Sequence, residues 1–217
     1  MSNENLTRRC FIARTGLGAL TSGMIAGVLS RPSMSWAAAK VGEPAPAFTA
    51  TATTGASVSL ADYRGKLVIL EWTNHECPYV RKHYESGNMQ ALQKEATGQG
   101  VVWLTIISSA PNEQGYVTPA QANELTATRN AAPTAVLLDP KGIVGRPYGA
   151  TNTPHMYLVD KAGLLAYAGA IDDRPTARKA DVQGANNYVR AALTAVMAGQ
   201  PVKTPATRAY GCTVKYS

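Results

Sequence analysis

The strongest constraint on the fold is an apolar run, LVILEW at residues 67–72, which is followed closely by Cys77 and Pro78. A short, nearly continuous apolar run is typical of a strand that is buried on both faces of a sheet. Proline is favoured at the first position of a helix, so Pro78 predicts a helix over 78–100, interrupted at Gly87. We therefore expect a central strand that leads into a helix, with Cys77 in the loop between them.

The rest of the chain continues this alternation of strands and helices. Further strands are predicted at residues 101–109, 133–139, 153–160 and 164–171. Helices are predicted from Thr118 to about Asn130 and over 184–199, and a small hairpin is predicted around Thr54-Gly55. Because strands first alternate with helices and finally pair as a hairpin, the sequence predicts an α/β class with a mixed sheet flanked by helices.

Residues 1–39 have the layout of a signal peptide. A basic region is followed by an apolar, glycine-rich stretch of 14 residues at 16–29 and by a small-residue end at Ala37-Ala38-Ala39. The arginine pair Arg8-Arg9, followed by CFI, resembles a twin-arginine signal. The apolar stretch is shorter than the ~20 residues that span a bilayer. We expect a periplasmic mature chain that begins near Lys40 and keeps no stable membrane span.

The basic charge of the chain comes partly from this leader. The formal net charge is +7, and the first 39 residues hold four of the 21 basic residues but one of the 14 acidic residues. The remaining basic residues are scattered, without a run longer than two. We therefore expect no nucleic-acid partner.

Cys77 is predicted to be a reactive thiol. Cys10 falls within the leader, so the mature chain holds Cys77 and Cys212. A thiol at a helix N-terminus faces unpaired N–H groups and the positive end of the helix dipole, which favour the thiolate. The neighbouring Glu76 opposes this effect. The alternative is that Cys77 is a small buried apolar residue.

The C-terminal tail, residues 200–217, carries Cys212. An extended tail reaches roughly 40 Å at ~3.3 Å per residue, so Cys212 can reach Cys77. One hypothesis is a resolving cysteine, which attacks an oxidised Cys77 and forms an intramolecular disulfide. The other is a permanent staple for the tail.

Three segments carry a resemblance to a known family. The entry segment and first core strand VGEPAPAFTATATTGASVSLADYRGKLVILEW, the motif NHECPYVRKH and the segment NTPHMYLVD resemble the redoxin (alkyl hydroperoxide reductase/thiol-specific antioxidant) branch of the thioredoxin superfamily. The resemblance covers residues 41–198 and implies a thioredoxin-like domain at 40–199. It also implies a cis-proline at Thr153-Pro154.

The sequence departs from the family at the activating positions. Val80 stands where a Cys-x-x-Cys pair has its second cysteine, and Asn74 stands where peroxiredoxins have threonine three residues before the cysteine. These departures favour thiol–disulfide exchange over peroxide reduction. The expected partner is a redox protein or a small thiol or peroxide substrate. No cofactor is expected, and the oligomeric state is left open.

The predicted site gathers around Cys77. The predicted catalytic residues are Cys77, Cys212, His75 and Pro154. The residues predicted to line the site are Trp72, Thr73, Asn74, Glu76, Pro78, Tyr79, Arg81 and His155. His75 or His155 is the candidate for acid–base assistance.

Two alternatives concern the other polar residues. A binding protein without turnover, for copper or zinc, would use His75, Cys77 and His155 as ligands. His83 is predicted to be an ordinary surface or helix residue, and Asp172-Asp173 a solvated pair of loop charges.

Overall fold

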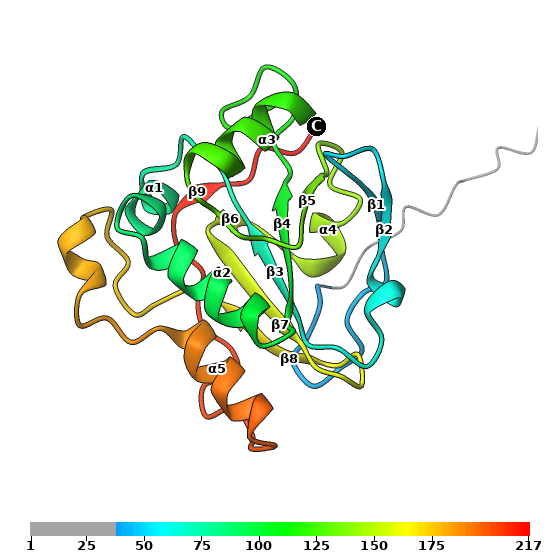
Figure 1. Ribbon diagram of the computed structural model, residues 1–217, viewed down its shortest axis with the longest axis vertical. Helices are drawn as coiled ribbons and strands as arrows, with labels where there is room; N and C mark the ends of the chain where they lie inside the picture. The colour runs from blue at the N-terminus through cyan, green and yellow to red at the C-terminus, as the bar shows by residue number, and fades with distance from the viewer. Residues whose placement is uncertain (1–37) are drawn as a thin grey trace, which may run out of the picture. The chain divides into compact units, whose positions relative to one another are not determined.

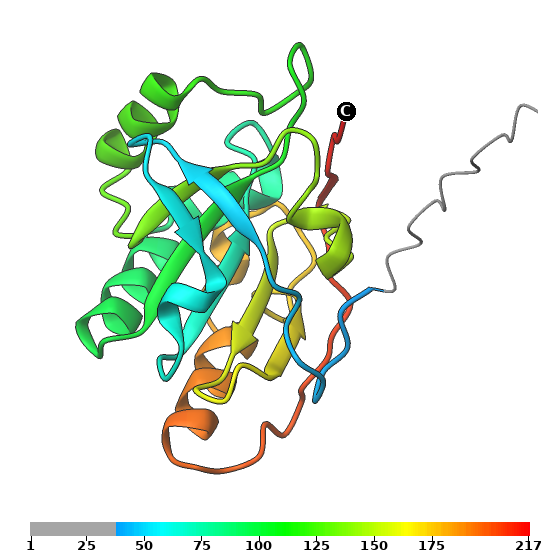
Figure 2. The same ribbon diagram turned by 90° about the vertical axis from the view of Figure 1, so that its right-hand side faces the viewer.

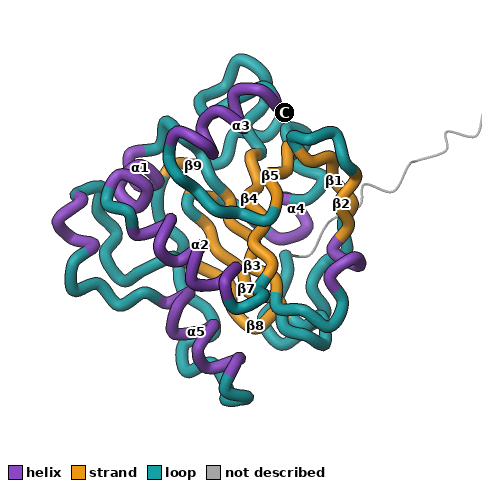
Figure 3. The backbone as a smooth tube through the Cα atoms, viewed as in Figure 1, coloured by secondary structure: helices purple, strands orange, loops and turns teal. Residues whose placement is uncertain are grey.

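The computed structural model describes residues 38–217, so residues 1–37 of the predicted signal segment, with Cys10, lie outside it. Seven strands form one mixed sheet in the order β2-β1-β5-β4-β3-β7-β8. The strands are β1 (Thr49–Ala52), β2 (Ser57–Ser59), β3 (Val68–Trp72), β4 (Val102–Ile107), β5 (Ala135–Leu138), β7 (His155–Val159) and β8 (Leu165–Gly169). The central strands β3, β4 and β5 are parallel, and the outer pairs are antiparallel. The predicted α/β class with a mixed sheet is confirmed (Figures 1 and 3).

Helices follow the predicted signals closely. They are α1 (Pro78–Glu85), α2 (Asn88–Gly98), α3 (Pro119–Thr128), α4 (Gly145–Tyr148) and α5 (Tyr188–Met197), with 3-10 turns η1 (Leu60–Tyr63) and η2 (Lys179–Val182). The predicted interruption falls at Gly87, whose φ of 76° lies in the left-handed region. Thr118 and Gln121 form the predicted capping box. Within the described residues, no helix has the length and apolar character needed to cross a membrane.

The two faces of the sheet have separate cores. Side chains alternate along β3, so Ile69 packs against the face covered by α1, α2 and α5, whereas Leu70 and Trp72 pack on the opposite face with Tyr148 of α4. Figure 2 shows α4 and the entry segment on that opposite side. Burial of both faces explains why β3 reads as a continuous apolar run.

The tail lies along the sheet and ends beside α4 (Figures 1 and 2). Its short strand β9 (Cys212–Thr213) pairs antiparallel with β6 (Asn152–Thr153), which directly precedes β7. Beyond β9, the amide of Ala110 donates to the Lys215 carbonyl at 2.7 Å, and Arg146 donates to the Ser217 carbonyl at 2.8 Å. The tail is thus fastened at Cys212 and between Cys212 and its end.

Candidate active site

Cys77 occupies the N-cap position of α1, without a side-chain hydrogen bond to the helix, and Pro78 begins the helix as predicted. The side chain is fully buried. Its thiol donates to the Thr153 carbonyl at 3.1 Å, and its sulfur accepts the Cys212 N–H at 3.4 Å. The Thr153-Pro154 bond is cis, as predicted. The cysteine loop, the cis-proline loop and the tail therefore meet at one sulfur atom.

Cys212 belongs to β9 and lies opposite Thr153 in the register of the small sheet. Burial, followed by a hydrogen bond and a charge interaction with Cys77, raises the pKa of the Cys212 thiol to about 12. Both cysteines are free thiols. Because the thiolate is the nucleophile, this pKa keeps Cys212 in the unreactive thiol form at neutral pH.

Gly211 permits the close approach of the tail. Its φ of 120° is rarely adopted by other residues, and an added Cβ would overlap the Thr153 carbonyl. Tyr79 lies next to this glycine, and its ring packs edge-on against Tyr210 at 5.8 Å between centroids. Tyr79, predicted to line the site, thus contacts the tail directly before Cys212.

Asn74 and Glu76 fasten the cysteine loop to the segment after β4. The Asn74 amide donates to the Gln114 carbonyl at 3.3 Å, and Glu76 accepts the Gly115 N–H at 2.6 Å. The Asn74 side chain also accepts the Glu76 N–H at 2.9 Å. Asn74 departs from the peroxiredoxin pattern and Glu76 opposes a thiolate at Cys77, and both side chains hold the cysteine loop in place.

His75 and His155 lie in different environments. His75 lines a crevice of about 30 Å³ with Thr73 and Arg129, and burial lowers its pKa. His155 stacks on Tyr157 at 4.5 Å, and burial lowers its pKa to about 4. Within residues 38–217, no hydrogen bond or ion pair joins either side chain to Cys77. Acid–base assistance by His75 or His155 stays a prediction.

Two other predicted lining residues point away from the sulfur. Trp72 lies in the core of the opposite sheet face, where its indole N–H donates to the Ser108 hydroxyl at 3.2 Å. Arg81 pairs with Glu85 at 2.8 Å, and both side chains are exposed. Alternation along β3 explains the position of Trp72, and helical periodicity explains that of Arg81.

The proposed metal ligands do not converge. In the part of the chain that the structure describes, no group of three or more histidine, cysteine or acidic side chains could hold a metal ion. His75, Cys77 and His155 therefore form no metal cluster there.

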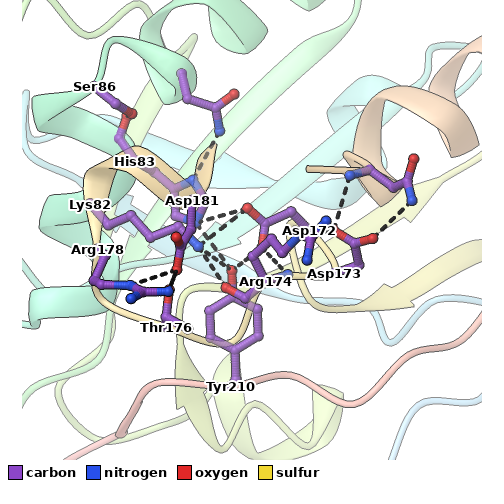
Figure 4. Close-up of polar contacts among 12 residues, drawn as sticks. Lys82, His83, Ser86, Asp172, Asp173, Arg174, Thr176, Arg178, Asp181 and Tyr210 are labelled. Atoms are coloured by element: carbon purple, nitrogen blue, oxygen red, sulfur yellow. Dashed lines mark hydrogen bonds and ion pairs between the residues drawn. The ribbon is translucent and has the colours of Figure 1, made fainter. Parts of the chain in front are cut away.

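A buried charge cluster was missed by the sequence analysis (Figure 4). Lys82, His83 and Asp172 are buried, and Tyr210 of the tail is half-buried. Lys82 lies 3.4 Å from the Asp172 carboxylate, and Tyr210 donates to the other oxygen of that carboxylate. The prediction of a solvated Asp172 is wrong. His83 lies on a helix, as predicted, but it is buried instead of exposed, because the tail and the loop after β8 fold over α1.

The fold and the cysteine–cis-proline contact define the class of this molecule as a thioredoxin-like α/β protein. The model of the AhpC/TSA family matches residues 41–168, which is more than half of the chain. The chain therefore belongs to the AhpC/TSA family.

The chain is also similar to individual proteins. The chain is 28% identical over 144 residues to the thioredoxin-like protein YneN of Bacillus subtilis (strain 168), covering 65% of this chain and 79% of YneN. A conserved protein from Geobacillus kaustophilus is similar in structure, with a TM-score of 0.71 at 25% identity over 82% of this chain and 93% of its own. A candidate thiol:disulfide interchange protein, DsbE, from Chlorobium tepidum gives a TM-score of 0.50 at 25% identity over 60% and 85%.

Proposed function

We propose that the protein is an exported thiol–disulfide oxidoreductase in which Cys77 is the nucleophile and Cys212 the resolving cysteine. The observation that carries this proposal is the Cys212 N–H bonded to the Cys77 sulfur across 135 residues of sequence. Membership of the AhpC/TSA family and the similarity to a thiol:disulfide interchange protein support redox chemistry at a cysteine.

The reaction consists of two exchanges. The Cys77 thiolate attacks one sulfur of a substrate disulfide, forms a mixed disulfide and releases the other sulfur as a thiolate, which takes up a proton. The Cys212 thiol then loses its proton and attacks the Cys77 sulfur. This step releases the second substrate thiol and leaves a Cys77–Cys212 disulfide. The substrate disulfide is reduced by two electrons, and the two protein thiols are oxidised; an external dithiol donor restores them.

The surroundings of Cys77 favour a disulfide substrate over a peroxide. Asn74, at the position where peroxiredoxins have threonine, is engaged with Gln114 and Glu76. Thr73 lines the crevice beside His75, and its hydroxyl has no hydrogen-bond partner in residues 38–217. No threonine hydroxyl is thus engaged with the Cys77 sulfur among the hydrogen bonds of this region.

Access to Cys77 requires the tail to move. The sulfur is fully buried, and β9 covers it from the side of the cis-proline. A protein disulfide, which presents an extended chain, can replace β9 along β6 by the same backbone pairing.

We place the protein in the periplasm on the basis of the leader. The paired arginines and the Ala-rich end at 37–39 carry this part of the proposal. An oxidising compartment is consistent with a cysteine pair that cycles between dithiol and disulfide.

Turnover assays with the chain lacking residues 1–39 test the function. The wild type is expected to reduce a protein disulfide with a dithiol donor and to consume hydrogen peroxide much more slowly. Cys77→Ser should abolish turnover, whereas Cys212→Ser should accumulate a mixed disulfide at Cys77. Turnover that survives in Cys77→Ser would contradict the proposal, and faster peroxide consumption would favour the peroxidase.

A further inference from the structure

The buried charge cluster lies beside the cysteines but takes no part in the exchange described above. Lys82 donates to the Arg174 carbonyl at 2.6 Å and lies 3.4 Å from both the Tyr210 hydroxyl and the Asp172 carboxylate. Figure 4 shows these side chains converging from α1, the loop after β8 and the tail. The cluster therefore joins three separate segments of the chain.

The hydrogen bonds of the cluster fit a single arrangement of protons. The Tyr210 hydroxyl donates to Asp172, so it accepts from Lys82 and from the Nε2–H of His83, at 3.2 Å. The Nδ1 atom of His83 then accepts from the Asn88 amide at 2.9 Å. This tautomer follows from the partners of the two ring nitrogens. Tyr210 is thus held by three buried groups at once.

Packing stability alone does not explain such a cluster. Taking a lysine and an aspartate out of water is expensive, and apolar residues of similar volume often give equal or greater stability. Buried polar groups can instead specify one arrangement among several, because only one register satisfies all of them. Here the register concerns a tail that has little regular secondary structure of its own.

Both ends of the cluster lead directly to a cysteine. Lys82 lies on α1, five residues after Cys77 at the N-cap position of this helix. Tyr210 precedes Cys212 by two residues, with only Gly211 between them. Fixing Tyr210 on Lys82 and Asp172 therefore fixes Cys212 relative to Cys77.

We propose that Lys82, Asp172 and Tyr210 are positioning residues that hold Cys212 against Cys77 and thereby set the stability of their disulfide. This inference rests on the proposed function. A tail held in place raises the effective concentration of Cys212 at the Cys77 sulfur. A tail released from the cluster lowers it and also uncovers Cys77.

The test combines equilibration in glutathione buffers with alkylation of Cys77. In the buffers, the protein dithiol and glutathione disulfide give the protein disulfide and two glutathione thiols. Tyr210→Phe removes the hydroxyl that reaches Asp172, and the equilibrium constant is expected to fall about tenfold, which is about 30 mV for this two-electron couple. Asp172→Asn should shift the constant in the same direction. In a Cys212→Ser background, Tyr210→Phe should speed the alkylation of Cys77 several-fold.

Tyr148→Phe is the matched control. Its hydroxyl donates to the Pro46 carbonyl at 2.9 Å in a buried position outside the tail. Tyr148→Phe should lower the thermal stability about as much as Tyr210→Phe does, without changing the glutathione equilibrium or the alkylation rate of Cys77. Equal shifts in both tyrosine variants would overturn the positioning role, as would unchanged values in Tyr210→Phe.

The two proposals can fail separately. A wild type that forms no Cys77–Cys212 disulfide would refute the resolving role, and the alkylation rate would still decide whether the cluster holds the tail. The wild type could form the disulfide while Tyr210→Phe and Asp172→Asn leave the glutathione equilibrium constant unchanged. That result would support the resolving role of Cys212 and refute the positioning role of the cluster.

Discussion

Two buried carboxylates, Glu71 on β3 and Asp172 after β8, are held in different ways. Glu71 accepts hydrogen bonds from four neutral donors, which belong to Tyr84, Gln93, Trp103 and Thr105. Asp172 is paired with the buried cation of Lys82 and accepts from Tyr210. The first site ties core strands and helices together, and the second ties the tail to the core.

Although both carboxylates are buried, they depend on different partners. Burial raises the pKa of Glu71, although its four hydrogen bonds lower it in part. The buried Glu71 carboxylate, which accepts only from neutral donors, is thus easier to protonate than a carboxylate in water, whereas the Asp172 charge is balanced by Lys82. Removing the cation should harm the tail site far more than neutralising the acid harms the core site.

The largest expected effect is that of Lys82→Met. Removing one partner leaves the Asp172 charge buried and uncompensated, which is expected to lower the free energy of unfolding by about 3–5 kcal/mol. Denaturant titration measures the change. Arg81→Met is the matched control, because the adjacent Arg81 makes an exposed ion pair with Glu85 and should have little effect. Similar losses in both variants would remove the distinction between the two sites.

His83 should make the tail site sensitive to acid. Burial, opposed by Asp172 and aided by Lys82, lowers its pKa to about 4 from an ordinary value of 6.5. The unfolded chain therefore takes up the proton first as the pH falls. The free energy of unfolding that is fully present above pH 6.5 decreases by about 3 kcal/mol as the pH drops from 6.5 to 4. His83→Gln should remove this loss in urea titrations at pH 4–7. If the free energies of unfolding of the wild type and of His83→Gln changed in parallel with pH, His83 would not be the source of the acid sensitivity.

Glu71 should give the core site a pH dependence of the opposite sign. Its folded pKa is raised, so its stabilising contribution is complete below the unfolded value of about 4.5 and is lost as the pH rises through the folded pKa. Within that window the loss is about 1.4 kcal/mol per pH unit. The free energy of unfolding of Glu71→Gln should therefore increase relative to that of the wild type as the pH rises. A constant difference between the two proteins over pH 4.5–8 would show that Glu71 does not titrate there.

Local signals predicted the fold and the position of Cys77 well. Each of these signals acts over only a few residues of sequence: the apolar run of β3, Pro78 at the start of α1, Gly87 and the capping box of Thr118. Such short-range rules can be applied without knowing the tertiary contacts. The contact between the two cysteines, predicted from reach, is also present in the structure.

The buried cluster could not be predicted in the same way. The contacts that join its separate segments link residues 38 to 128 positions apart. Charged residues are rarely buried unless they are paired, and the sequence does not reveal so distant a partner. One signal was available: Asp172 directly follows the apolar strand segment LLAYAGAI, where the chain is still within the core. The alternation along β3 likewise indicates that Trp72 and Glu71 face opposite sides.

The reduction potential of the Cys77–Cys212 pair tests the central claim most directly. A resolving cysteine requires a disulfide that forms and is reduced in each cycle, so we predict a potential between about −270 and −120 mV, the range of thiol–disulfide oxidoreductases. The measurement is a titration of the wild type in redox buffers, read by the mass of the peptides that contain the two cysteines. A potential below about −300 mV would identify a permanent staple of the tail and would contradict the account.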